Sequence, residues 1–226
     1  MKRLCWGNPA DQRLSCHLGL KEAGYVEGQN VAIECRWADD HYDRLPALAA
    51  ELVHRHVDVI AAAATPSAVA AKAATATIPI VFAVGGDPVK MGLVPSLNRP
   101  GGNVTGITAL NIEMGPKRLE LLHQVIPTAT IIALLVNPTS AAAETITKDA
   151  QAAAHALGLQ LHVLHASSDR DFDTVFATAA QLRAGALVIS PDVFFTSRSQ
   201  QLAKLTVDHA VPAIYEFREF AARPAV

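Results

Sequence analysis

The sequence has few aromatic residues, no excess of basic charge and no long apolar run, and these shortages exclude several classes of function. Lysine and arginine total 19 against 21 acidic residues, so the formal net charge is -2. The basic surplus that binds nucleic-acid phosphates is therefore missing. No stretch reaches the roughly 20 continuous apolar residues that a bilayer span needs. We expect no nucleic-acid partner and no direct membrane insertion.

Cysteine is also scarce. The three cysteines are Cys5, Cys16 and Cys35, and no two of them have CxxC spacing. Such an odd, scattered set argues against a disulfide framework and against a structural zinc site. The N-terminus has only residues 4–6 as an apolar stretch before Gly7, whereas a secretory signal needs about 7–15 apolar residues. We therefore expect no signal peptide in this chain, and a cytoplasmic protein if it is expressed as written.

Signatures of catalysis are missing as well. There is no GxGxxG after a predicted strand, and there is no GxxxxGK(S/T), GxSxG or HExxH motif. His54 and His56 are two residues apart on a predicted helix, so they point in different directions and make a poor metal pair. No nucleophile and base can be matched. The sequence predicts no catalytic residues, no metal site, no cofactor and no enzymatic activity.

What the sequence does contain is a regular alternation of apolar segments. Half of the residues are hydrophobic, which is enough to form a core. Short apolar runs, typical of buried parallel strands, alternate with alanine-rich or amphipathic segments of helical period. The predicted strands are residues 30–37, 57–64, 78–84, 104–108, 130–136, 159–164, 186–190 and 213–217. The predicted helices between them are residues 42–56, 68–76, 117–125, 140–157, 172–182 and 197–209. This order predicts an α/β fold with parallel sheets.

A proline- and glycine-rich segment at residues 98–103 divides the chain into two stretches of similar pattern. Two lobes, each with its own sheet, fit this division better than one continuous sheet. We place the boundary near Asn111. The sequence thus predicts an N-terminal lobe over residues 1–110 and a C-terminal lobe over residues 111–226.

Small polar and acidic residues follow several predicted strands at their carboxyl ends. Ligands bind open parallel sheets at these ends, where loops and helix N-termini meet. Hydroxyl groups and free helix N–H groups suit a carboxylate, and acidic side chains suit an amine or a hydroxyl. The candidate ligand-binding residues are Thr65, Pro66, Ser67, Gly86, Asp87, Asn137, Ser140, Asp192, Phe194 and Glu216. The alternative for each polar residue is a helix cap or a turn, and the alternative for Phe194 is core packing.

Four runs of sequence carry a family resemblance: GYVEGQNV at 24–31, YDRLP at 42–46, VGGDPV at 84–89 and LNRPGGNVTG at 97–106. They closely resemble ABC transporter substrate-binding proteins of the tryptophan/tyrosine uptake type. Further likeness at residues 134–138, 154–161 and 212–221 extends the resemblance over about residues 19–222.

This resemblance implies a type 1 periplasmic-binding-protein fold, with two Rossmann-like lobes joined by crossing segments. A small polar solute, an amino acid or a related compound, would bind in the interlobe cleft. Closure of the lobes would then present the solute to an ABC transporter permease in the periplasm. By position, the resemblance assigns Thr65, Pro66, Ser67 and Asp87 to the ligand loops of the first lobe. It assigns Asn137, Asp192 and Glu216 to strand ends of the second lobe.

The sequence departs from its relatives at two places near these strand ends. Residues 141–143 are all alanine, where relatives that prefer aromatic amino acids carry small polar residues. Val193 stands where those relatives have an amide.

The chain also differs from the family at both ends. Family members have a signal sequence and a longer first helix, and they continue past residues 217–220 to cross back into the first lobe. We therefore expect an incomplete, marginally stable first lobe and a second lobe without the return crossing. Loss of the first strand would leave two sheet edges unpaired and apolar surface uncovered. Residues 3–6 are a short stub that could replace this strand.

Two alternatives to solute import remain at this point. The first is a cytoplasmic ligand-sensing domain related to repressor effector cores, which share the bilobal fold. No helix-turn-helix head is found in the sequence to support it. The second alternative is a non-functional fragment of a substrate-binding protein.

Overall fold

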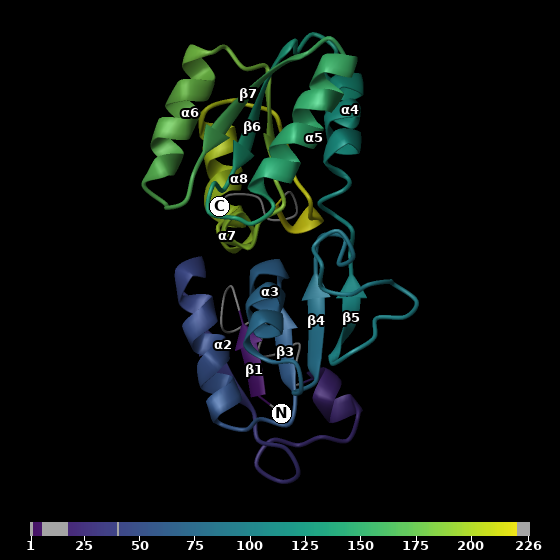
Figure 1. Cartoon of the computed structure of the whole chain (residues 1–226). Coiled ribbons are helices and arrows are strands. Elements are labelled where there is room, and N and C mark those ends of the chain that lie inside the picture. The colour runs from purple at the N-terminus through teal and green to yellow at the C-terminus, as the bar shows by residue number, and fades with distance from the viewer. Residues whose placement is uncertain (1, 6–17, 40, 221–226) are drawn as a thin grey trace. The chain divides into compact units, whose positions relative to one another are not determined.

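The computed structural model describes residues 2–5, 18–39 and 41–220, so Trp6 and Cys16 lie outside the described residues. The chain divides into two compact units, Met1–Leu110 and Asn111–Val226 (Figure 1). Cys35 is a free cysteine. No helix in the described ranges is long and apolar enough to cross a membrane.

Unit 1 (residues 1–110) contains a five-stranded sheet in the order β2-β1-β3-β4-β5. Its strands are β1 Lys2–Cys5, β2 Glu34–Trp37, β3 Ile60–Ala63, β4 Ile80–Val84 and β5 Val104–Thr108. All of the pairings are parallel, and β1 pairs with both β2 and β3. The short N-terminal stub therefore forms the first strand of the sheet. Because β1 pairs with β2 and β3, these two strands do not have the unpaired edges that loss of β1 would leave.

Two helices cover one face of this sheet. They are α2 Leu45–His54, which follows the 3-10 turn η1 Tyr42–Arg44, and α3 Thr65–Ala74. Each has a proline in its first turn, where the missing N–H costs nothing. In α2 the buried residues Leu45, Ala49 and Leu52 recur at helical spacing. Helix α2 packs against α3 and β1, and α3 packs against β3 and β4, where Ile60 and Phe82 are buried.

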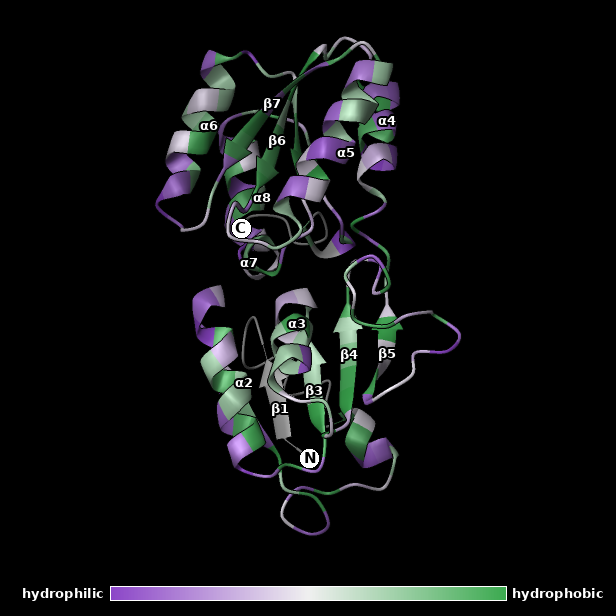
Figure 2. Ribbon diagram, viewed as in Figure 1, coloured by the Kyte–Doolittle hydropathy of each residue, from purple (hydrophilic) through white to green (hydrophobic). Residues whose placement is uncertain are grey.

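The opposite face of the unit 1 sheet keeps apolar side chains exposed. Along β4 the burial alternates, and Val81 is 46% exposed. On β5, Ile107 is 74% exposed. Figure 2 shows β3 and β4 as mostly hydrophobic, so the strands offer apolar residues to both faces although only one is well buried. This exposure does not come from loss of the first strand, because β1 is present and paired on both sides.

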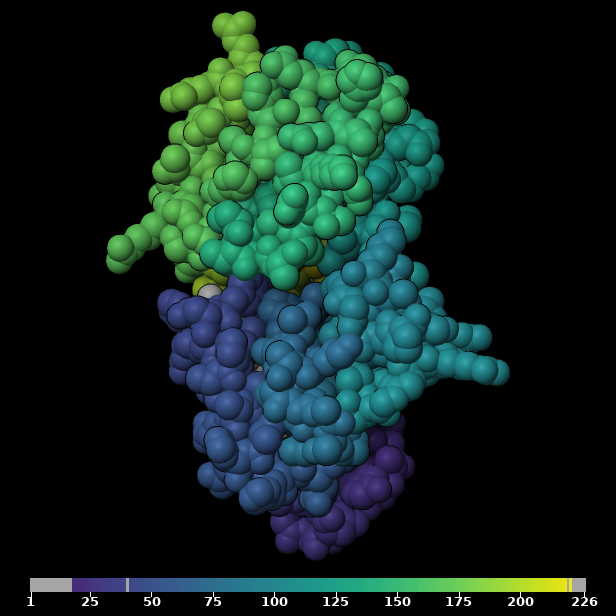
Figure 3. Space-filling model, in the orientation of Figure 1, coloured from purple at the N-terminus to yellow at the C-terminus, as the bar shows by residue number. Residues whose placement is uncertain are grey.

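The turn-rich connection from β4 to β5 projects from the surface of unit 1 (Figure 3). Its base is held by Asn103, whose Nδ2 donates to the carbonyl oxygens of Thr75 at 3.3 Å and Ile78 at 2.7 Å. The backbone N–H of Ile80 donates to the Asn103 carbonyl oxygen at 2.7 Å. These bonds fix the point at which β5 begins beside β4.

Unit 2 (residues 111–226) contains a four-stranded parallel sheet in the order β7-β6-β8-β9. Its strands are β6 Ile131–Val136, β7 Gln160–His165, β8 Ala186–Ile189 and β9 Ala213–Ile214. Strand β9 is shorter than the predicted 213–217, because only Ala213 and Ile214 pair with β8. The chain leaves the ladder before Glu216.

Helices cover both faces of the unit 2 sheet (Figure 1). They are α4 Gly115–Val125, α5 Ala143–Ala156, α6 Asp171–Gln181, α7 Val193–Ser197 and α8 Ser199–Asp208. Alternate residues of β6 divide between two cores. Ile132 and Leu134 pack with α4 and α5, whereas Ala133 and Leu135 pack with α6, α7 and α8.

The helix predicted over residues 197–209 is present as α8 Ser199–Asp208, and a short helix that was not predicted, α7 Val193–Ser197, precedes it. Asp192 has extended backbone, and its side chain accepts a hydrogen bond from the N–H of Phe194, so it caps α7. Arg198 then leaves helical geometry, at φ -109° and ψ 19°, between α7 and α8. The hydrophobic pattern could not show whether Asp192, which follows a strand, begins a helix or lies in a loop.

We expect unit 1 to unfold at a lower temperature than unit 2, because one face of its sheet keeps apolar side chains exposed and both faces of the unit 2 sheet are covered. Differential scanning calorimetry should show two transitions. Phe82→Ala in β4 should move only the lower one, and Phe176→Ala in α6 only the upper one, because both rings are buried. Each truncation should cost about 3–5 kcal/mol. One cooperative transition that accounts for both units would contradict this expectation.

Candidate functional site

The carboxyl edge of the unit 1 sheet brings together the residues that follow β3 and β4. The two strands are paired in register, with Ala63 opposite Ala83, and the N–H of Ala64 donates to the Ala83 carbonyl oxygen at 2.8 Å. Helix α3 begins directly after β3, with Thr65 and Pro66 in its first turn. The predicted residues Thr65, Pro66, Ser67, Gly86 and Asp87 therefore lie along one edge.

Ser67 is the most informative of these side chains. It is 0% exposed, and its Oγ has no hydrogen-bond partner in the described part of the chain. The N-cap residue of α3, Ala64, supplies no side-chain hydrogen bond to the first turn. A buried hydroxyl and an uncapped helix N-terminus together suit an anionic group such as a carboxylate.

The backbone is strained where β3 turns into α3. Ala64 has φ 80° and ψ 154°, a region populated almost only by glycine. A residue with a Cβ pays about 1–3 kcal/mol for such a conformation. Ala64 is the single residue between the end of β3 at Ala63 and the start of α3 at Thr65.

Asp87 also has a local structural role. Its Oδ1 accepts hydrogen bonds from the backbone N–H groups of Val89 at 2.8 Å and Lys90 at 3.3 Å. The neighbouring Gly86 is buried, and its carbonyl oxygen accepts a bond from the Thr108 hydroxyl at 2.8 Å. The turn alternative considered for Asp87 is thus present in the structure.

The carboxyl edge of the unit 2 sheet joins Asn137 and Asp192. Asn137 follows β6 and is 2% exposed, and its Nδ2 donates to Asp192 Oδ1 at 3.2 Å. The Asn137 Oδ1 accepts bonds from the N–H and the hydroxyl of Thr139. Ser140 is half-buried in the turn that follows, and its N–H donates to the Asn137 carbonyl oxygen at 3.1 Å.

Glu216 is bonded through both carboxylate oxygens. Its Oε1 accepts from the Thr196 hydroxyl of α7 at 2.9 Å. Its Oε2 accepts from Asn111 Nδ2 at 2.6 Å, across 105 residues of sequence. Glu216 therefore ties the end of β9 to α7 and to the first residue of unit 2.

The surroundings of Glu216 favour its neutral form. Burial raises the pKa of Glu216 to about 7; the Thr196 hydrogen bond and the positive charge of Arg118 oppose this rise, and the negative charge of Asp192 adds to it. Burial also lowers the pKa of the Arg118 guanidinium. At neutral pH the Glu216 side chain is therefore a mixture of acid and carboxylate.

Three polar residues at this edge were not predicted as site residues. Arg118 Nη1, Asn111 Oδ1 and Ser190 Oγ are buried atoms without a hydrogen-bond partner in the described part of the chain. Asn111 was recognised only as the lobe boundary and Ser190 only as the last residue of a strand. Arg118 lies in the first turns of α4 and is half-buried, and nothing in the helical pattern predicts this.

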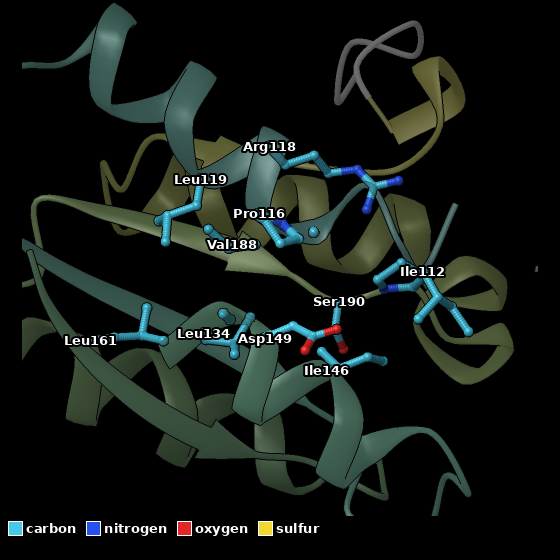
Figure 4. Close-up of a pocket in the computed structure, with 13 residues that line it drawn as sticks. Ile112, Pro116, Arg118, Leu119, Leu134, Ile146, Asp149, Leu161, Val188 and Ser190 are labelled. Atoms are coloured by element: carbon cyan, nitrogen blue, oxygen red, sulfur yellow. The ribbon is translucent and has the colours of Figure 1, made fainter. Parts of the chain in front are cut away.

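A small pocket lies inside unit 2, between the start of α4, the sheet and α5 (Figure 4). Its walls are mostly apolar, with Ile112, Leu134 and Val188 among them. Ser190, Asp149 and Arg118 are polar residues of its lining and are labelled in Figure 4. The volume of about 20 Å³ holds about one water molecule. This pocket is too small to hold an amino acid.

Phe194 lies in the core of unit 2. It is 2% exposed, and its ring centroid is 5.6 Å from that of Phe172. The Arg198 guanidinium lies over its ring at 4.6 Å, and Arg198 Nε donates to Asp169 Oδ1 at 2.7 Å. These contacts support the core-packing alternative for Phe194 and give Arg198 partners within the protein. Among the described residues, no cluster of His, Cys, Asp and Glu could hold a metal ion.

A family model described as "ABC transporter substrate binding protein" matches residues 13–226. A curated relative, the "Tyrosine-binding protein" of Clostridioides difficile, is 40% identical over 119 residues. That stretch is 52% of this chain and 34% of the relative. The match therefore spans about a third of the curated relative's length.

Solved structures share the fold. A conserved domain protein from Vibrio cholerae is 28% identical with a TM-score of 0.83, and the alignment covers 98% of this chain and 75% of that one. An ABC domain in complex with L-Trp from Streptococcus pneumonia is 21% identical with a TM-score of 0.76, covering 94% of this chain and 73% of that one. The likeness agrees with the predicted type 1 periplasmic-binding-protein fold.

Glu216→Gln is expected to stabilise unit 2 at high pH. The pKa of Glu216 in the folded protein, about 7, lies above its ordinary value of 4.5, so its stabilising contribution is complete below about pH 4.5 and is lost as the pH rises through 7. The neutral glutamine avoids that loss. At pH 8.5, urea unfolding should give the variant a free energy of unfolding up to about 3 kcal/mol higher than that of the wild type.

The two proteins should have similar stability below pH 5. Glu144→Gln, at an exposed position of α5, is the matched control and should show no such pH-dependent gain. A Glu216→Gln variant that is less stable than the wild type at pH 8.5 would contradict the proposed cost of the buried charge.

Proposed function

Because the chain belongs to the ABC transporter substrate-binding protein family, we propose that it captures a small polar solute for an ABC importer, and that this solute is an α-amino acid. The proposal includes a permease as partner and a periplasmic location, as the family resemblance implies. The family is one of solute-binding proteins, in keeping with the expectation that the chain is not an enzyme. The same match favours import over the ligand-sensing alternative.

The acidic edge of unit 2 is the observation that carries the choice of an amino acid. Asp192 and Glu216 follow the neighbouring strands β8 and β9, and the charge of Asp192 acts on Glu216. Arg118 is the cation that acts on the same carboxylate. A cluster with two acidic groups and one basic group is short of positive charge, so an ammonium group on the solute would complete it.

The edge of unit 1 supplies the complementary chemistry. The N-terminus of α3 carries partial positive charge, and the Ser67 hydroxyl beside it is buried without a partner in the described part of the chain. A carboxylate would use both groups. We propose that the carboxylate binds at this edge and the ammonium at the edge of unit 2, so that a single solute is held in an interlobe cleft.

The curated relative supports an aromatic side chain on this amino acid, because it is a tyrosine-binding protein. The three alanines at 141–143 and Val193 are the positions at which this chain departs from such relatives. We therefore propose an aromatic or similarly apolar α-amino acid, with side-chain selectivity different from that of the relatives.

Isothermal titration calorimetry with L-tyrosine and L-tryptophan tests this function. We expect both charges of the amino acid to be required, so tyramine and 3-(4-hydroxyphenyl)propionate should bind at least 10-fold more weakly than L-tyrosine, because each lacks one charge-assisted contact. Asp192→Asn should weaken binding by about 10–100-fold. Asp173→Asn, at an exposed position in the first turn of α6, is the matched control. An absence of amino-acid binding would refute the proposal.

Ser67→Ala separates binding from folding. Removing a buried hydroxyl that has no partner among the described residues should leave stability unchanged or raise it slightly, because no hydrogen bond is lost and an unsatisfied group disappears. The same change should weaken L-tyrosine binding by about 5–10-fold. Chemical unfolding and calorimetric titration of one preparation measure both effects. Loss of stability together with unchanged affinity would show that the hydroxyl serves folding instead.

A further inference from the structure

We propose that solute capture at the edge of unit 2 is linked to the release of one proton from Glu216, with Asn111 and Arg118 as the positioning residues of this exchange. The inference rests on the proposed function, since it concerns how the same edge receives an ammonium group. It gives Asn111 and Arg118 a role in binding, which the sequence analysis did not predict for either residue.

The hydrogen bonds around Glu216 accommodate both of its protonation states. As a carboxylate it accepts from Asn111 Nδ2 and from the Thr196 hydroxyl. As an acid it needs an acceptor for its own O–H. Asn111 Oδ1 is buried and has no partner in the described part of the chain. A half-turn of this amide exchanges donor for acceptor, so the Glu216 O–H can then donate to Asn111 Oδ1.

The charges around Glu216 are balanced between the two states. Arg118 from α4 favours the carboxylate, and Asp192 at the start of α7 disfavours it. Thr196 from α7 donates to it, and the preceding Tyr215 is neutral at physiological pH because burial raises its pKa further. With burial included, the pKa of Glu216 is about 7, so the empty site holds a fractional proton at neutral pH.

Arrival of an ammonium group removes this balance. A positive charge beside Glu216 stabilises the carboxylate, so the O–H bond breaks, its electron pair stays on the carboxylate oxygen and the proton passes to solvent. The solute therefore binds the deprotonated protein. Apparent affinity should fall about 10-fold for each pH unit below 7 and should be independent of this group well above 7. Arg118, whose Nη1 has no hydrogen-bond partner in the described part of the chain, sets where this change occurs.

Titration calorimetry with L-tyrosine between pH 5 and pH 8.5 tests the linkage. The wild type should bind about 100-fold more weakly at pH 5 than at pH 8.5. At pH 6, titration in two buffers of different ionisation enthalpy should show release of close to one proton per solute bound. Glu216→Gln should abolish both the pH dependence and the proton release. Persistence of either in this variant would assign the proton to another group and overturn the inference.

Arg118→Gln is the variant that probes positioning. Loss of its positive charge should raise the pKa of Glu216, so the midpoint of the affinity profile should move to higher pH. Arg118→Lys should restore most of the profile. Lys117→Gln, which removes an exposed neighbouring charge that is paired with Glu120, should leave the profile unchanged. If the midpoint does not move in Arg118→Gln, Arg118 has no positioning role.

The two levels of the proposal fail differently. Failure of L-tyrosine and L-tryptophan to bind at every pH would overturn the proposed function and the inference together. Binding with one affinity from pH 5 to pH 8.5, without proton release, would overturn the inference and leave the proposed function standing.

Discussion

Parallel pairing of neighbouring strands is the constraint on which both candidate edges depend. All strands of a parallel sheet end at the same edge, so residues that are far apart in sequence become neighbours once their strands pair. Asn137 and Asp192 are 55 residues apart and share a hydrogen bond because β6 and β8 are adjacent. The shift of one strand by one residue would turn these side chains to the opposite face of the sheet.

The strand order could be predicted well because buried parallel strands are continuous apolar runs with sharp ends. Residues 104–108 form β5 as expected. The sequence was less informative where local hydrogen bonds decide the structure. The cap that Asp192 places on Phe194 starts α7 early, and it moves Phe194 from a predicted site position into the aromatic core. Such a cap depends on a rotamer and a backbone angle, neither of which the hydrophobic pattern reports.

The same distinction applies to the candidate site. Asn137, Asp192 and Glu216 could be named from sequence because topology alone places strand-end residues together. The sequence could not predict which of these side chains form hydrogen bonds with each other. Asn111 reaches Glu216 across 105 residues, and the burial of Arg118 results from the packing of α4 against the sheet, a tertiary property. The protonation state of Glu216 follows from these contacts, so residue spacing and composition could not predict it.

The polar groups without partners among the described residues reduce the stability of the protein. A buried donor or acceptor without a partner costs about 1–3 kcal/mol. Ser67 Oγ, Asn111 Oδ1 and Arg118 Nη1 have no partner within the ranges that the structure describes. Strain at Ala64 adds a cost of similar size. Folding therefore works against these residues in the empty protein. Under the proposed function a solute carboxylate would accept a hydrogen bond from the Ser67 hydroxyl, so a group that reduces stability without solute would contribute to affinity with it.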